Sequence, residues 1–187
     1  MPILGTIASS KQTAADDYVF IDKFVSNGSE SSVTFTVPNT YKHLQVRSMV
    51  RHARSNTNGP TWIQPNNDQT AANYAVSYLY SYGVGNNVGA GLFLTTEPGM
   101  ATAGAGTTAA TGIYGIGVAT IYDYNDTNKF KSCIAYGGLS NNNSGDELTA
   151  NHWIVWRNTN AITSLVCRPF TAPYAVNSVI SLYGIKG

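Results

Sequence analysis

Hydrophobic and polar residues alternate along much of this chain, in short runs that end at turn-forming residues. In residues 43–53, apolar side chains recur at every second position, which predicts a strand with one buried face. Residues 18–25 and 32–37 show the same alternation. The dipeptide Asn27-Gly28 lies between these two runs, and Asn-Gly between alternating segments indicates a β-hairpin.

The second half of the chain contains five further strand candidates with polar connections. They are residues 113–124, 129–137, 152–157, 162–168 and 178–185. Residues 125–128 and 158–160 have the length of hairpin loops and are expected to join the first and second candidates and the third and fourth. About nine short strands with almost no helix predict an all-β fold, an antiparallel β-sandwich or jelly roll.

Residues 73–82 fit two patterns. Tyr74, Tyr78 and Tyr82 recur every fourth position, as on one face of a helix, whereas Val76, Tyr78 and Tyr80 alternate as in a strand. We expect a short helical turn here.

Three other segments show little periodicity. Residues 54–67 are interpreted as a long loop with a short strand at 61–64, and residues 139–150 as a polar loop. The Gly/Ala/Thr-rich residues 98–111 are interpreted as an exposed loop.

Two parts of the chain differ in character. Residues 18–187 show no linker and are treated as one β-sandwich domain. Residues 1–17 form an N-terminal arm that is apolar at Ile3, Leu4 and Ile7 and then small and polar. An extended arm of this kind frays on a monomer. We therefore expect these three side chains to dock on a neighbouring subunit or on the shell of a particle.

Charge is scarce. The 187 residues include 11 Lys+Arg and 10 Asp+Glu, a net charge of +1, beside 20 Thr, 16 Ser and 18 Asn. The absence of a basic cluster excludes a protein that binds nucleic acid by neutralising phosphates. No apolar run is long enough for a membrane-spanning helix, and the first ten residues do not resemble a signal peptide. Weak repulsion between copies suits a subunit held in an assembly.

The residues that carry enzyme or metal chemistry are few and scattered. His43 and His52 are too far apart along one strand to share a metal ion, and no short-spaced ligand pair occurs. The two cysteines, Cys133 and Cys167, lie in apolar runs and are interpreted as buried free thiols rather than nucleophiles or a disulfide. We expect no cofactor and no resident metal.

The acidic loop residues leave two alternatives open. Asp123, Asp126, Asp146 and Glu147 could form a glycosidase pair or, with neighbouring Asn side chains, a calcium site. The loop spacing matches no EF-hand, and such residues commonly cap turns. We therefore expect a protein that is not an enzyme.

Aromatic and arginine residues are the most prominent candidates for contact. Trp62, Tyr74, Tyr78, Tyr80 and Tyr82 are interleaved with Asn and Asp, and three explanations remain open for them: core packing, a subunit interface or glycan contact. Trp153 and Trp156 face opposite sides of a strand, so one is expected in the core and the other outside.

Two arginines complete the set of contact candidates. Arg47 and Arg51 fall on one face of the predicted strand, and in a chain so poor in charge they favour interface ion pairs over a phosphate track.

Four segments resemble one known family. The opening PILGTIASS, residues 37–47 (VPNTYKHLQVR), residues 121–131 (IYDYNDTNKFK) and residues 161–187 with the final LYGIKG are similar, in order and spacing, to small virion structural proteins of tailed bacteriophages of the marine and cyanobacterial type. Residues 56–111 match this pattern poorly.

The resemblance implies a non-enzymatic component of the virion, a capsid decoration or tail appendage. Its expected partners are further copies of itself, as a homotrimer, and other capsid or tail proteins. It implies neither nucleic-acid binding nor membrane insertion. The alternative is an adhesin module that binds a glycan on the host surface through the central Tyr/Trp/Asn region.

Overall fold

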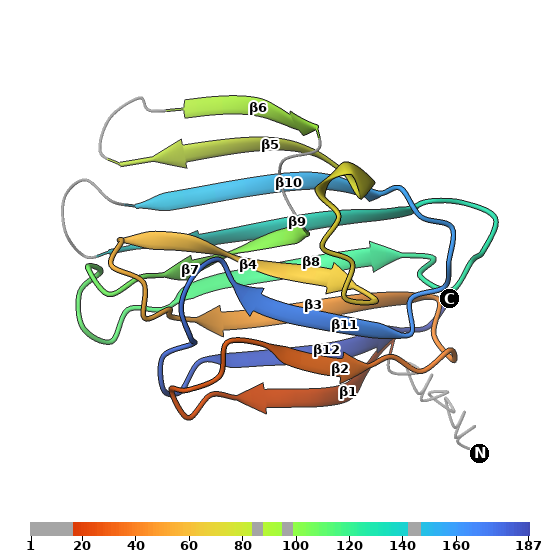
Figure 1. The fold of residues 1–187 in the computed structure, drawn as a ribbon, viewed down its shortest axis with the longest axis horizontal. Helices are drawn as coiled ribbons and strands as arrows, with labels where there is room; N and C mark the ends of the chain where they lie inside the picture. The colour runs from red at the N-terminus through yellow and green to blue at the C-terminus, as the bar shows by residue number, and fades with distance from the viewer. Residues whose placement is uncertain (1–16, 84–87, 95–98, 142–146) are drawn as a thin grey trace, which may run out of the picture.

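Two antiparallel β-sheets pack face to face in the computed structural model, which describes residues 17–83, 88–94, 99–141 and 147–187. The large sheet has eight strands in the order β1-β12-β3-β8-β9-β10-β5-β6, and the small sheet has four in the order β2-β11-β4-β7 (Figure 1). The strands are β1 (Tyr18–Val25), β2 (Val33–Thr36), β3 (His43–Val50), β4 (Asn58–Pro65), β5 (Tyr74–Tyr82), β6 (Val88–Leu94), β7 (Met100–Ala105), β8 (Gly115–Tyr122), β9 (Lys131–Leu139), β10 (Leu148–Trp156), β11 (Ser164–Pro169) and β12 (Val179–Ile185). The predicted β-sandwich is confirmed.

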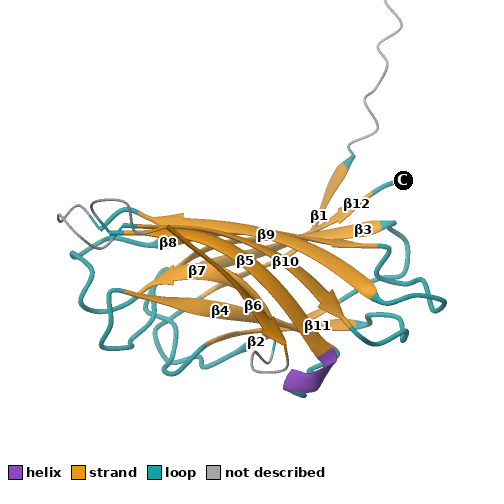
Figure 2. Cartoon of the chain, turned by 90° about the horizontal axis from the view of Figure 1, so that it is seen from above, coloured by secondary structure: helices purple, strands orange, loops and turns teal. Residues whose placement is uncertain are grey.

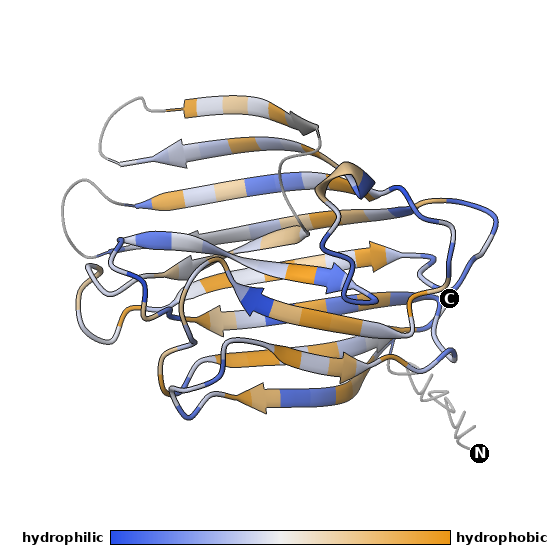
Figure 3. Ribbon diagram, viewed as in Figure 1, coloured by the Kyte–Doolittle hydropathy of each residue, from blue (hydrophilic) through white to orange (hydrophobic). Residues whose placement is uncertain are grey.

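The core lies between the two sheets, which form separate layers in Figure 2. Side chains alternate between the faces of a strand, so each sheet turns one set of apolar residues inward. In β8, for example, Ala119 and Ile121 are buried and Ile116 is exposed. Hydrophobic and hydrophilic residues follow one another along the strands of both sheets (Figure 3).

Two of the three predicted hairpins are wrong. Strand β1 pairs with β12 and β2 pairs with β11, so the Asn27-Gly28 turn connects the two sheets instead of joining partners. Residues 158–160 also cross between sheets, from β10 to β11. The reason is that distant strands supply better partners for these segments than their sequence neighbours do. The third hairpin, β8 with β9 around residues 125–128, is confirmed.

The helical turn predicted for residues 73–82 is also wrong. A 3-10 turn, η1 (Ala71–Asn73), precedes this segment, and all nine residues of β5 pair with β10. Tyrosine and valine are favoured in strands, and pairing on both sides with β10 and β6 overrides the weaker fourfold recurrence of tyrosine.

The Gly/Ala/Thr-rich segment at 98–111 contains a buried strand, β7, and not only an exposed loop. Its small side chains allow it to lie directly against β8 and β9. A Cβ atom added to Gly117 of β8 would lie 2.5 Å from the Cβ of Thr102 in β7, closer than such atoms approach in folded proteins. Low side-chain volume, which looks like a loop signal in the sequence, is here what close sheet packing requires.

Several smaller predictions have clear outcomes. Cys133 and Cys167 are buried free thiols, as expected, and burial raises the pKa of both. Trp156 is buried and Trp153 is exposed, also as expected. Strand β4 is longer than the predicted 61–64, and strands β9 and β10 extend into both ends of the predicted loop at 139–150.

Candidate functional site: an aromatic groove beside the small sheet

A groove of about 380 Å³ lies where the large sheet continues past the small sheet. Its floor comes from the inward-facing side of β5 and β10, and its wall comes from β4 and β7. Figure 1 shows the cause: β10, β5 and β6 form one end of the large sheet and extend beyond the small-sheet strands. Unequal sheet widths therefore leave inward-facing side chains without a covering layer.

The floor is built on two stacked tyrosines. The rings of Tyr78 and Tyr80 lie 5.6 Å apart at an interplanar angle of 22°. They face Gly91 and Gly89 of the neighbouring strand β6. A Cβ atom added to either glycine would lie 2.5 Å from a ring carbon, so the absence of side chains on β6 is what allows both rings to lie over its backbone.

The wall is also aromatic. Trp62 of β4 is only 5% exposed, and its ring contacts Phe170 edge-on at 6.3 Å between centroids. Phe170 follows β11 and is 47% exposed. The guanidinium carbon of Arg54 lies 4.8 Å from the centroid of the Phe170 ring, within cation–π distance. Ala101 of β7 pairs with Trp62 and leaves room beside it.

The polar groups of the groove are cationic or neutral. Among the described residues that line it, none is an Asp or Glu, and Arg54 forms no ion pair with any described carboxylate. Burial lowers the pKa of His152, which therefore stays neutral at pH 7. In the described part of the chain its Nδ1 atom has no hydrogen-bond partner. The groove thus offers aromatic rings and one permanent cation, whereas the Nδ1 atom of His152 is itself buried.

The structure separates the five aromatic residues singled out in the sequence. Trp62, Tyr78 and Tyr80 line the groove together. Tyr74 is fully buried, and its hydroxyl donates to the backbone carbonyl of Asp68 at 2.7 Å, so it belongs to the core. Tyr82 is half-buried at the end of β5 and does not line the groove.

The two arginines singled out in the sequence also lie apart. Arg47 is on the face of the large sheet that points away from the small sheet, with its guanidinium carbon 5.4 Å from the Tyr18 ring and 4.5 Å from the Tyr183 ring. Strand β3 ends at Val50, so the expectation that Arg51 shares a strand face with Arg47 is wrong. The Arg51 guanidinium donates to the backbone carbonyls of Thr107, Ala109, Ala110 and Ile113 at 2.8–3.2 Å.

The face that carries Arg47, called the outer face below, is largely apolar. Its exposed large side chains come from seven of the eight strands: Tyr18 and Phe20 of β1, Met49 of β3, Ile116 and Tyr122 of β8, Tyr136 of β9, Trp153 of β10, Leu79 of β5 and Leu92 of β6. A solvated sheet face normally carries polar and charged residues. This face is therefore a second candidate for contact, separate from the groove.

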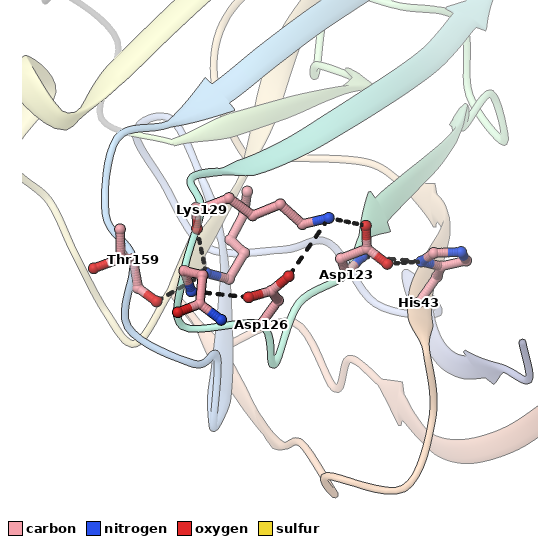
Figure 4. A network of polar contacts seen from close by, with 7 residues as sticks. His43, Asp123, Asp126, Lys129 and Thr159 are labelled. Carbon is pink, nitrogen blue, oxygen red and sulfur yellow. Dashed lines mark hydrogen bonds and ion pairs between the residues drawn. The ribbon is translucent and has the colours of Figure 1, made fainter.

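Asp123 and Asp126 form ion pairs with Lys129 in the β8–β9 turn and do not form a reactive pair of carboxyl groups (Figure 4). The Lys129 ammonium lies 2.6 Å from Asp123 and 3.5 Å from Asp126. The hydrogen bond from Lys129 lowers the pKa of Asp123, and the backbone N–H of Asn128 lowers that of Asp126. A glycosidase general acid needs the opposite shift.

The remaining acidic and histidine candidates do not converge. Glu147 accepts a bond from Ser140, and Asp146 lies outside the described residues. The described part of the chain holds no group of three or more His, Cys, Asp and Glu side chains suited to a metal ion. His52 is buried, and its Nε2 atom lies 3.1 Å from the hydroxyl oxygen of Thr61, within hydrogen-bond distance. None of the described helical segments could span a membrane. The predicted arm residues Ile3, Leu4 and Ile7 lie outside the described residues.

Sequence reasoning missed half of the groove. Phe170 and His152 are far from Tyr78 in sequence and carry no motif, so only the pairing of β10 with β5 and the position of β11 bring them there. One signal was present in the sequence: the alternating glycines Gly89 and Gly91, which lie in β6. Their meaning depends on knowing that tyrosines occupy the paired positions of β5.

The fold and its surfaces define an antiparallel β-sandwich with an aromatic groove on one side and an apolar sheet face on the other. Comparison of the chain with protein-family models, with curated proteins and with solved structures finds no match.

Proposed function

We propose that the protein is a non-enzymatic structural subunit of a tailed-phage particle, which self-associates through the outer face of its large sheet. The observation that carries this proposal is the outer face itself. Trp153, Tyr136 and Ile116 are 43%, 51% and 61% exposed there. Apolar patches larger than a few hundred Å² on soluble proteins mark contact sites.

The size of the outer face suits a stable interface. Eight strands at roughly 4.8 Å spacing and about eight residues at roughly 3.3 Å each give an area near 900 Å². A standard interface buries about 800 Å² on each partner. A depression of about 410 Å³ between Arg47, Ile116 and Tyr136 offers a place for a protruding side chain of the partner.

Charge on the outer face is compatible with a second copy as the partner. Arg47 lies on β3, the third strand from the β1 edge, where the rings of Tyr18 and Tyr183 and a 2.7 Å hydrogen bond from its Nε to Gln45 already engage it. Arg47 and Lys23 are cations on this face, since both pair with Ser181 of β12, and its large exposed side chains are uncharged, so charge does not prevent an identical copy from docking. The resemblance to phage virion proteins favours a trimer, in which the outer faces surround the threefold axis.

Sedimentation velocity of the full chain tests this proposal. The wild-type protein is expected near three times 20.0 kDa, about 60 kDa. Trp153→Glu places a charge in the outer face and should give a folded 20.0 kDa monomer. The matched control is Phe130→Glu, at a 51% exposed position in the β8–β9 turn, which should keep the oligomer.

Other outcomes have definite meanings. A wild-type protein that stays monomeric at about 100 µM, well above the dissociation constant expected of a standard-size interface, would refute self-association through this face. A dimer that Trp153→Glu dissociates would keep the interface and correct the copy number. Stoichiometric recovery of the protein from purified phage particles tests the virion assignment, and its absence from those particles would refute it.

Glycan binding is a second candidate function, as an adhesin module that contacts the host surface. The specific observation that supports it is the groove, where Trp62, Tyr78 and Tyr80 come together from two sheets. The groove and the outer face lie on different sides of the large sheet, so one protein can serve both functions.

A further inference from the structure

The groove combines a flat aromatic floor with a single cation. The rings of Tyr78 and Tyr80 are nearly parallel and stacked, with an interplanar angle of 22° and 5.6 Å between their centroids. The volume of the groove, about 380 Å³, lies within the range of small-ligand sites in proteins. A ligand for this site needs a flat apolar face for the rings and polar groups around its edge. A pyranose ring has both.

We infer that the groove binds an anionic saccharide, one whose sugars carry carboxylate or sulfate groups. A sugar ring stacks on Tyr78 and Tyr80, and Arg54 receives the anionic group. This inference rests on the glycan-binding function proposed above and adds the chemical class of the glycan. It does not depend on self-association.

Arg54 is the residue that selects for negative charge. Its guanidinium lies over Phe170 at 4.8 Å and makes no ion pair with a described carboxylate. The ring supports one face of the guanidinium, whereas the N–H groups donate in the guanidinium plane, where a carboxylate or sulfate can accept two parallel bonds.

The surroundings of Arg54 reinforce this selection. No Asp or Glu is present among the described lining residues to repel an anion. Glu147, which adjoins the lining residue Leu148, accepts a hydrogen bond from Ser140 at 3.2 Å. His152 adds an imidazole whose pKa burial lowers, so it brings no second permanent charge to the groove.

The experiment is calorimetric titration of the full chain with three probes: an alginate hexasaccharide, the same hexasaccharide after reduction of its carboxylates, and a sulfated carrageenan hexasaccharide. The wild-type protein should bind an anionic probe about tenfold more tightly than the reduced one, the effect of one charge-assisted contact. Arg54→Gln should abolish that preference. Tyr80→Ala should weaken every probe about tenfold, because it removes half of the platform.

Matched variants control for non-specific effects. Arg157→Gln removes an equal charge from an exposed position outside the groove. Phe130→Ala removes an aromatic side chain that is 51% exposed in the β8–β9 turn, outside both the groove and the outer face. Both should bind as the wild type does. Circular dichroism of each variant shows that it is folded.

The results separate the two proposals. Equal affinity of the wild type for all three probes would overturn the anionic class and leave glycan binding in place. Binding that Tyr80→Ala does not weaken would overturn the groove as the site. No binding of any probe at millimolar concentration would overturn both the glycan-binding function and the anionic class, and would leave the self-association proposal unaffected.

Discussion

Asp68 holds together the start of strand β5, and its removal should destabilise the protein strongly. Its Oδ2 atom accepts the indole N–H of Trp156 and the amide of Asn73, both at 2.7 Å, and its Oδ1 accepts the backbone N–H of Thr70 at 2.9 Å. These bonds fix the 3-10 turn that precedes β5 and tie it to the end of β10. Asp68 therefore positions the strand that carries the groove tyrosines.

The cost of Asp68→Ala can be worked from these contacts. Trp156 is 1% exposed, so its indole N–H would lose its acceptor without gaining water, at about 1–3 kcal/mol. The other two donors are more exposed and recover part of their bonds with solvent. We expect a total near 3 kcal/mol, which for a domain of this size lowers Tm by about 6–12 °C.

Urea unfolding followed by tryptophan fluorescence measures this loss at pH 7. Asp126→Ala is the control, because that half-buried carboxylate accepts a similar backbone bond from Asn128 and its other partner, Lys129, is solvent-exposed, so the substitution should change stability little. Equal effects of the two substitutions, or a loss below 1 kcal/mol for Asp68→Ala, would refute the reasoning.

The pH dependence gives a further check on Asp68. Burial alone would raise its pKa, but the bonds from Trp156, Asn73 and Thr70 outweigh burial and leave the pKa below its ordinary value of 3.8. The stabilisation is therefore complete above that value and is lost as the pH falls through the lowered pKa. The difference between wild type and Asp68→Ala should shrink over the same range.

Three other predictions follow from buried contacts. Burial, with a smaller contribution from Arg54, lowers the pKa of His52 to about 4. As the pH falls from 6.5 to 4, the unfolded chain therefore binds a proton at this histidine before the folded protein does. The free energy of unfolding should drop by up to about 3 kcal/mol over this window, measured by urea titration, and by less in His52→Gln. Arg51→Met leaves four loop carbonyls without their donor, and limited proteolysis should cleave residues 107–113 faster than in the control Arg157→Met. Gly91→Ala places a methyl group against the Tyr78 ring and should change the near-UV circular dichroism and weaken saccharide binding, whereas Ala90→Ser on the opposite side of β6 should do neither.

Strands could be predicted from the sequence where one face of the strand is buried and the other is exposed to solvent. Alternation in residues 43–50 and 179–185 marks strands because burial on one side selects apolar residues at every second position. Strand β7 shows the limit of this signal. Its Ala, Thr and Gly side chains are small because β7 lies close against β8 and β9. The sequence alone does not show that these positions need small side chains, because it does not show which strands contact β7.

Strand pairing was the least predictable part of the fold. Asn27-Gly28 marks a turn correctly but not the partner of β1, which is β12 at the other end of the chain. Residues 158–160 likewise mark a turn that crosses between sheets. Local sequence determines how the backbone reverses, whereas the choice of partner depends on which pairing buries the most apolar surface over the whole chain.

The candidate site was predictable only as a set of residue types. Trp62, Tyr78 and Tyr80 could be singled out as contact residues, yet the same reasoning chose Tyr74, whose hydroxyl is in the core, and did not find Phe170 or His152. Exposure distinguishes these tyrosines, and exposure depends on where the small sheet ends.

The sequence by itself determined the class of this protein: a weakly charged, all-β chain with free buried thiols and an excess of aromatic and amide side chains. Only the tertiary structure decided which of those side chains remain accessible. The physical reason is the unequal width of the two sheets, since four strands cannot cover eight, and the inward-facing rings of β5 are left beside the edge of the smaller sheet.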